Sequence, residues 1–189
     1  ANVLAYDTRA VVAEQVESLG GKFLKIDIGE TGQTKDGYAK ELTEEQKAKQ
    51  QEAQRDAIAN SDIVITTAQL FGRKPPVLIS KNTLALMKPG SVVVDMAATS
   101  GGNVEGSVAG ETVEINGVKG IGNGNWSQFV AKAATDMYAN NIYNLVDEFL
   151  DEESKTFALN LEDDILAGCV IAHEGKITNE MLLNAYKGA

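Results

Sequence analysis

The chain has 189 residues, of which 43% are hydrophobic, so it is long enough for one substantial core and an appended segment. Its formal net charge of −10 repels phosphate backbones and anionic membrane surfaces, which argues against nucleic acid as a partner. One cysteine, Cys169, excludes an internal disulfide framework and a multi-cysteine zinc site, and one histidine, His173, argues against Ser-His or Cys-His catalysis.

The hydrophobic residues are not gathered into a membrane-spanning stretch. No run approaches the roughly 18 to 20 apolar residues that a transmembrane helix needs, and no signal peptide opens the chain. We therefore expect a soluble segment without direct membrane insertion. With one cysteine and one histidine no metal site is expected, so a ligand or cofactor should supply the chemistry.

The first 26 residues predict a β-α-β unit. Residues 2–6 form an apolar strand pattern that ends at Asp7. Residues 11–19 have an apolar helix face that stops at two glycines, and residues 23–26 form a second strand pattern. An acidic residue at the first strand's tip is typical of the second strand of a dinucleotide fold, where it accepts hydrogen bonds from the adenosine ribose. The alternative is that Asp7 only caps a helix.

A polar, glycine-rich stretch follows over residues 28–42. Structureless loops of about 12 residues or more are uncommon in compact domains and are usually lids, binding loops or disordered segments. Its one aromatic residue, Tyr38, stands where a lid would carry a contact residue. The alternative is a solvated insertion whose tyrosine packs on a neighbour.

A capping box at Thr43 predicts the start of the next helix. The helix is highly charged and is expected to run to about Asn60. Its polar face is ordinary surface, although Gln50 could face the cleft.

Two buried-strand patterns, residues 62–68 and 91–95, form the centre of the chain. Continuous apolar runs of this length, bounded by turn residues, are typical of strands covered on both faces. A short helix over residues 81–87, capped by the preceding serine, makes the unit β-α-β. In open parallel sheets, ligands bind outside the carboxyl ends of the strands, which predicts a site at residues 66–70 and 97–103.

The remainder predicts a hairpin, a long helix and a terminal segment. Asn116-Gly117, between two strand patterns, is a strong type I′ turn signal. Residues 127–149 form an amphipathic helix whose apolar positions are expected in a core, and residues 155–189 have too little apolar surface to fold alone. We expect an NAD(H)-binding domain over residues 1–126, and a segment over residues 127–189 that packs on another domain or a dimer partner.

These patterns predict an α/β fold with a Rossmann-type doubly wound parallel sheet that is incomplete at its N-terminal βα unit. Such a fold opens with a strand, a G-x-G-x-x-G loop and a helix whose N-terminus holds the pyrophosphate. The glycines at 120, 122 and 124 do not match, because they do not open a helix directly after a first strand. We expect the downstream part of a longer protein, whose C-terminal helix and hairpin segment returns to a second domain.

Six blocks carry a family resemblance. They are Asp7-Thr8-Arg9, residues 14–23, residues 37–41, residues 65–68, residues 87–92 and Gly101-Gly102-Asn103. Over most of its length the chain resembles the NAD(H)-binding component, domain I, of proton-translocating nicotinamide nucleotide transhydrogenase. In that family, domain I passes a hydride between its NAD(H) and the NADP(H) held by a separate domain III, and a membrane domain couples this to proton movement.

The resemblance implies nine cofactor-binding residues: Asp7, Thr8, Arg9, Gly37, Tyr38, Gln50, Thr67, Ala68 and Gln69. The first three would hold the adenosine ribose. Gly37 and Tyr38 would lie on a mobile loop that closes over the nucleotide, with Gln50 behind it. Thr67, Ala68 and Gln69 would lie beside the cofactor. The family usually has an aliphatic residue in place of Gln69. The sequence also departs from the family pattern at residues 122–128. This implies that contacts between domains differ there, including those to domain III.

The resemblance also implies partners and a location. The partners are domain III and the membrane domain of the same enzyme, and the component is typically a homodimer. It would face the cytoplasm in bacteria or a mitochondrial-type matrix. Hydride transfer between two nicotinamides requires no protein acid or base, so no catalytic residue is predicted.

Two alternative functions remain open. Alanine dehydrogenase shares the fold and the Gly-Gly motif, but its members place an aspartate where Thr99 stands, which makes amino-acid oxidation the weaker interpretation. A regulatory module would bind NAD without hydride exchange. The predicted lid with Tyr38 favours the enzyme, because closure over a reactive cofactor excludes water.

Overall fold

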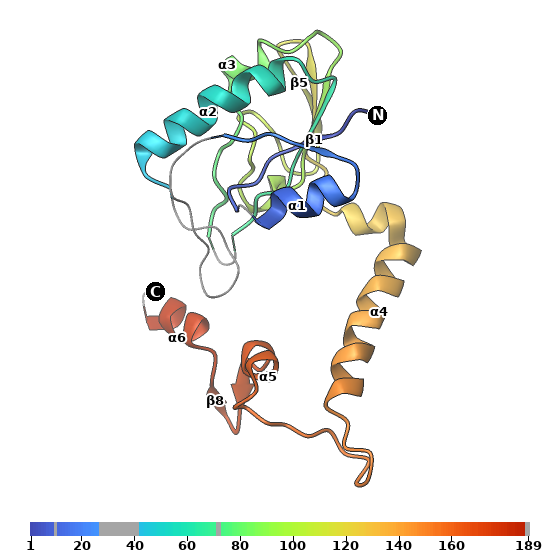
Figure 1. Ribbon diagram of the computed structural model, residues 1–189. Coiled ribbons are helices and arrows are strands. Elements are labelled where there is room, and N and C mark those ends of the chain that lie inside the picture. Colours follow the sequence, from blue (N-terminus) through green and yellow to red (C-terminus); the bar gives the residue numbers. More distant parts are fainter. Residues whose placement is uncertain (10, 27–41, 71–72, 188–189) are drawn as a thin grey trace. The chain divides into compact units, whose positions relative to one another are not determined.

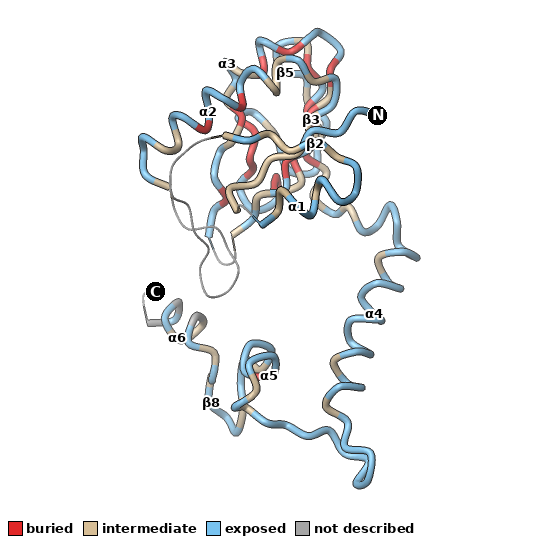
Figure 2. Tube along the Cα trace, viewed as in Figure 1, coloured by how far each residue is buried: buried red, intermediate tan, exposed pale blue. Residues whose placement is uncertain are grey.

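The computed structural model describes residues 1–9, 11–26, 42–70 and 73–187 (Figure 1). The chain divides into two compact units, Ala1–Trp126 and Ser127–Ala189. Buried residues are concentrated in the first unit (Figure 2). None of the helices in the described part of the chain has both the length and the apolar character that a bilayer span requires.

The first unit begins with the predicted β-α-β arrangement. Strand β1 (Leu4–Ala5) pairs in parallel with β2 (Lys22–Phe23), and helix α1 (Val11–Ser18) connects them. The helix ends at Ser18, and the chain turns away at Gly20, which has φ +82°, a conformation that glycine adopts without strain. The predicted elements are confirmed, although both strands are shorter than their apolar patterns.

Helix α2 (Glu44–Ala59) begins at the predicted capping box. The Gln46 backbone N–H donates to the Thr43 hydroxyl over 3.2 Å, and the Thr43 backbone N–H donates to the Gln46 side-chain oxygen over 3.0 Å. These two bonds satisfy donors that a helix start leaves unpaired. Gln50 and Gln54, four residues apart and therefore on one helix face, are both buried.

A four-stranded sheet forms the centre of the first unit. Its order is β3 (Ile63–Thr66), β4 (Val92–Asp95), β6 (Val118–Ile121), β5 (Thr112–Ile115). Strands β3, β4 and β6 are mutually parallel, and β5 is antiparallel to β6. Asn116 and Gly117 have φ of 52° and 78°, so the hairpin turn has positive φ at both central positions, as predicted for type I′.

The core of this unit lies around α3 (Lys81–Leu84) and the middle of β4. It consists of Ile79, Leu84, Met87, Val93, Val104 and Val118. The Ser80 hydroxyl caps the helix by accepting from the Thr83 backbone N–H over 3.2 Å. The helix ends three residues earlier than predicted. There the backbone tightens into i→i−3 bonds, such as Met87 N to Leu84 O, ahead of Pro89.

One prediction about the sheet is wrong. We expected both central strands to be covered on both faces, and β4 meets this, since Val93 is fully buried. On β3, however, Ile63 and Ile65 are 64% and 60% exposed, because alternate side chains of a strand point to opposite faces and only the other face meets this core. Among the described strands, β3 pairs with β4 alone and β1 pairs with β2 alone.

The second unit consists of four further elements after the 3₁₀ turn η2 (Trp126–Val130). They are α4 (Ala131–Glu148), α5 (Asp164–Cys169), the hairpin of β7 (Ala172–His173) with β8 (Lys176–Ile177), and α6 (Glu180–Lys187). The long helix is confirmed, but most of its apolar side chains, expected in a core, are exposed: Met137 is 70% exposed, whereas Ala134 and Leu145 are half-buried. Of the side chains described in this unit Leu166 alone is buried, so the unit contains almost no core for the helix to join.

Candidate functional site

The carboxyl ends of β3, β4 and β6 lie at one edge of the sheet, because the three strands are parallel. The loops that follow them are in contact. The Gln69 side-chain amide, after β3, donates to the Met96 carbonyl, after β4, over 3.2 Å. A Cβ at Gly122, after β6, would lie 3.1 Å from the Ala98 Cβ. The predicted ligand edge is therefore one continuous surface formed by three loops.

The glycines around β6 serve packing. Gly120 lies inside β6, and a Cβ there would lie 3.3 Å from the Val113 side chain on β5. A Cβ at Gly122 would overlap the Val108 carbonyl oxygen, and one at Gly124 would overlap the Thr99 side chain. The structure thus explains this glycine string by close approach of neighbouring segments.

The residues predicted beside the cofactor follow directly after β3. Thr66, the last strand residue, is buried and donates to the Val94 carbonyl over 3.4 Å. Thr67 and Gln69 are exposed, and Ala68 is half-buried. The structure therefore brings Thr67, Ala68 and Gln69 together with the loop after β4, and Gln69 has a definite role in holding these two loops together.

Two polar residues at this edge were not among the predicted binding residues. Asp95 ends β4 and is 1% exposed, and Asn103 ends the loop that follows and is completely buried. The Asp95 carboxylate accepts the backbone N–H groups of Ala97, Asn103 and Val104 over 3.0 to 3.2 Å. An acidic residue at a strand end, followed by a Gly-Gly-Asn sequence, was the available signal for a loop that folds back onto the strand.

Asp7, Thr8 and Arg9 lie just beyond β1 and are half-buried. Asp7 Oδ1 accepts the Arg9 backbone N–H over 2.8 Å and its Nε–H over 3.0 Å, and Oδ2 accepts from Nη2 over 2.9 Å. Partial burial works to raise the pKa of Asp7, but the hydrogen bonds and charge of Arg9 outweigh it, so the pKa lies below its ordinary value. Asp7 is therefore ionised at neutral pH and held in one orientation.

Of the remaining predicted residues, the structure describes Gln50, which lies on α2. Gln50 is buried on this helix, as a residue behind a binding loop would be. Gly37 and Tyr38 lie outside the described residues. The contacts given above join the loops after β3, β4 and β6 to one another, whereas those of Asp7 go to Arg9. Convergence of Asp7 with the three loops stays a prediction.

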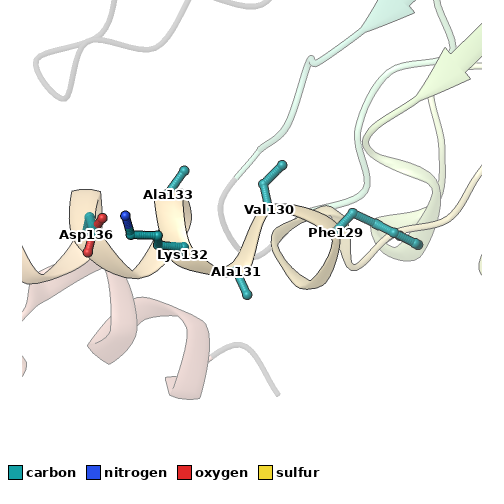
Figure 3. Close-up of a pocket in the computed structure, with 6 residues that line it drawn as sticks. All are labelled: Phe129, Val130, Ala131, Lys132, Ala133 and Asp136. Carbon is teal, nitrogen blue, oxygen red and sulfur yellow. The ribbon is translucent and has the colours of Figure 1, made fainter.

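A hollow of about 470 Å³ lies along the start of α4 in the second unit. Six consecutive or nearby residues line it: Phe129, Val130, Ala131, Lys132, Ala133 and Asp136. Figure 3 shows that they come from the end of η2 and the beginning of α4, with Val130 and Ala131 pointing to opposite sides. Ligand sites need polar groups that converge on one point, so this hollow is not the candidate site.

Comparison with known proteins gives one consistent result. The model of the alanine dehydrogenase/PNT C-terminal domain matches residues 1–180. The first part of NAD(P) transhydrogenase subunit alpha of Rhodospirillum rubrum is 41% identical over 182 residues, which cover 95% of this chain and 47% of that protein. The crystal structure of transhydrogenase from Sinorhizobium meliloti aligns with a TM-score of 0.70 at 37% identity, covering 94% of this chain and 45% of that one.

Alanine dehydrogenase is a more distant relative. The enzyme of Halomonas elongata is 31% identical over 140 residues, covering 71% of this chain and 37% of that protein. The resemblance that the six sequence blocks carry is thus confirmed, as is the Rossmann-type α/β class. The chain spans about half the length of these two transhydrogenase proteins.

Proposed function

The chain belongs to the alanine dehydrogenase/PNT C-terminal domain family, and from this membership we propose that it is the NAD(H)-binding part of a nicotinamide nucleotide transhydrogenase. In the proposed reaction a hydride passes between NAD(H) bound here and NADP(H) bound on a partner domain. A membrane domain of the same enzyme couples this transfer to proton movement, and the component acts as a homodimer.

The observation that carries the proposal is the carboxyl edge of the sheet. Three loops meet there, after β3, β4 and β6, and dinucleotides bind at this edge in open α/β sheets. The exposed Thr67 and Gln69 project from the same loop at this edge. This is the surface against which the nicotinamide half of the nucleotide would lie.

Asp7 fits the adenosine ribose in the chemistry of its acceptor atoms. The Arg9 bonds described above use Oδ1 twice and Oδ2 once, and the Thr8 backbone N–H also bonds to this carboxylate. A ribose hydroxyl would donate to a carboxylate oxygen from the side away from Arg9. Arg9 would keep the carboxylate ionised and oriented, and so spare the nucleotide the cost of ordering it.

NAD(H) supplies the hydride chemistry when it is bound. The protein's contribution is then to bind, to orient and to exclude water. Gln69 and the bonds between loops hold the edge in one shape, and Tyr38 closes the predicted lid. No side chain of this chain is assigned a proton-transfer role.

The pyrophosphate would be held by a segment outside these 189 residues. Strands β1 and β3 each have one pairing edge without a partner among the described strands, and in the dinucleotide fold the first strand lies between their counterparts. A first strand with its glycine loop would pair with both edges and place the loop next to Asp7. It would also complete the sheet beside the exposed side chains of Ile63 and Ile65.

Alanine oxidation is the second candidate, and one position argues against it. The loop after β4 carries Thr99 where a substrate-binding aspartate would be needed. The Thr99 side chain lies so close to Gly124 that a Cβ on that glycine would overlap it. A longer carboxylate side chain would have to turn away from that contact. A regulatory module without turnover would share the binding edge but not the reaction.

The test is a titration of the complete protein with NADH, followed by nicotinamide fluorescence, with and without an NADP(H)-loaded partner domain. The proposal expects saturable NADH binding and hydride exchange once the partner is added. Binding without exchange would indicate the regulatory module. Exchange with pyruvate and ammonia instead of the partner nucleotide would indicate alanine dehydrogenase, and absence of NADH binding would reject all three.

A further inference from the structure

Asn103 links the loop after β4 to the segment after β3 through its Nδ2 and its backbone carbonyl, while its Oδ1 is buried without a hydrogen-bond partner among the described residues. Its Nδ2 donates to the carbonyl of Ala68 over 3.0 Å and to that of Pro76 over 2.8 Å. Its own backbone carbonyl accepts the N–H groups of Leu78 over 2.8 Å and Ile79 over 3.0 Å. One fully buried residue after β4 therefore makes four hydrogen bonds to the segment after β3, at both ends of that segment.

Asp95 holds Asn103 in this position. Both carboxylate oxygens accept the Asn103 backbone N–H, over 3.2 and 3.0 Å, and Oδ2 also accepts that of Val104 over 3.1 Å. Hydrogen bonds to an ionised acceptor are the stronger kind. Gly102, with φ +80°, lets the chain turn there, and a Cβ at this position would lie 2.9 Å from Asp95 Oδ2. The loop is thus closed onto the end of β4 by buried bonds.

The orientation of the Asn103 amide follows from its partners. Both neighbours of Nδ2 are carbonyl oxygens, which accept hydrogen bonds and cannot donate them. The nitrogen must therefore face these two carbonyl oxygens. No other side chain of this size offers two N–H donors from one amide nitrogen. This requirement distinguishes Asn103 from an ordinary loop residue.

We infer that Asn103 is a positioning residue for the nucleotide, acting through the backbone of Ala68. The inference rests on the proposed function, in which Thr67, Ala68 and Gln69 lie beside the cofactor. Ala68 would be held from two sides, by Asn103 at its own carbonyl and by the bond from Gln69 to Met96 at the next residue. Loss of Asn103 releases the loop that the nucleotide must meet.

The test compares three variants of the complete protein: Asn103→Ala, Asn103→Asp and the control Ser61→Ala. Ser61 lies before β3, outside the predicted ligand edge, and its hydroxyl donates to the Ala57 carbonyl over 2.7 Å, so its removal leaves the segment after β3 attached. The dissociation constant for NADH is measured by fluorescence at a temperature well below the thermal midpoint of every variant. NADPH binding to the partner domain is measured in parallel.

The expected result is a dissociation constant for NADH about tenfold higher in Asn103→Ala, equivalent to about 1.4 kcal/mol, with Ser61→Ala within about twofold of the parent. NADPH binding should be unchanged. In Asn103→Asp the new carboxylate faces two carbonyl oxygens and lies near Asp95, which raises its pKa. Its NADH affinity should therefore recover as the pH is lowered, because the protonated acid can donate to one carbonyl, whereas the affinity of Asn103→Ala should not.

A purely structural role would give another pattern. If Asn103→Ala lowers the thermal midpoint but binds NADH within about twofold of the parent, the positioning role is rejected. If that variant does not fold, an Asn103→Asp affinity that equals the parent's and is independent of pH rejects it as well. Absence of NADH binding in the parent protein would reject the proposed function itself, which separates the two failures.

Discussion

The guanidinium of Arg9 lies against the carboxylate of Asp7 two residues before it, with Nη2 2.9 Å from Oδ2 and Nε 3.0 Å from Oδ1. The two side chains thus form a two-point pair, in which the planar donor group of arginine matches the two carboxylate oxygens. Because the Arg9 backbone N–H also donates to Oδ1, the turn after β1 and the orientation of the carboxylate are set together.

The first prediction concerns the charge of Asp7. Asp7→Asn should weaken NADH binding by roughly 1.5 to 3 kcal/mol, the range for a lost hydrogen bond to a charged group. Fluorescence titration of the complete protein measures it. Asp62→Asn is the matched control, since Asp62 is exposed and distant in sequence from the predicted ribose contacts, and should bind NADH as the parent does. Equal affinity in both variants would reject the ribose role.

The second prediction concerns pH. The pKa of Asp7 in the folded chain lies below its ordinary value of 3.8. The pair with Arg9 therefore contributes its full stabilisation of the fold at pH values above 3.8. This stabilisation is lost as the pH falls through the lower, folded-state pKa. Because Arg9 is partly exposed, the contribution should stay below about 1 kcal/mol.

Arg9→Ala provides the comparison for this titration. Removing the guanidinium takes away its side-chain hydrogen bonds and its charge, which lower the pKa, while the backbone N–H bond and partial burial of the carboxyl remain. The Asp7 carboxyl, followed by NMR, should then titrate at a higher pH than in the parent. An unchanged titration midpoint would show that the pair does not persist in solution.

The third prediction concerns Gly102. Gly102→Ala should destabilise the protein more than Gly110→Ala, measured by urea unfolding of the complete protein. The two glycines have almost the same φ, +80° and +81°, so the backbone strain of roughly 1 to 2 kcal/mol is common to both. A Cβ at Gly110 meets nothing within 4 Å, whereas one at Gly102 lies 2.9 Å from Asp95 Oδ2.

The difference between these two variants isolates the Asp95 bonds. We expect about 1.5 to 3 kcal/mol of additional destabilisation in Gly102→Ala, the range for a hydrogen bond to a charged group. Equal destabilisation would mean that the loop after β4 adjusts without losing its bonds to Asp95.

The fourth prediction concerns the lid. Tyr38→Ala should slow transhydrogenation more than it lowers the thermal midpoint, because a loop of this polarity contributes little core. Steady-state rates with NADH and an NADP(H) analogue, set beside thermal unfolding, give both quantities. A midpoint that falls in proportion to the rate would identify the tyrosine as a structural residue.

Where the sequence predicted structure correctly, the interactions are local. The capping box at Thr43, the Ser80 cap and the Asn116-Gly117 turn all depend on residues within three positions of one another. Such patterns are decided by backbone geometry and a few neighbouring side chains, so they can be read before any tertiary contact is known.

Exposure of apolar residues was predicted less well. The apolar runs of β3 and α4 looked like core, yet Ile63 and Met137 are largely exposed in this chain. Periodicity identifies which face of an element is apolar, but it does not identify which neighbour covers that face. Burial depends on the partner, and here the covering surface is not among the described residues.

By itself, the sequence determined the order of the elements as far as α4, the parallel carboxyl edge and the acidic tip of β1, because each follows from periodicity and short-range turn chemistry. Only the tertiary structure revealed the roles of Asp95 and Asn103. Asn103 meets its partners across 8, 27 and 35 residues of sequence, through a backbone N–H and two carbonyl groups that every residue possesses. No residue pattern marks the bonds to Ala68 and Pro76, since these two carbonyl acceptors are determined by where the folded loops meet.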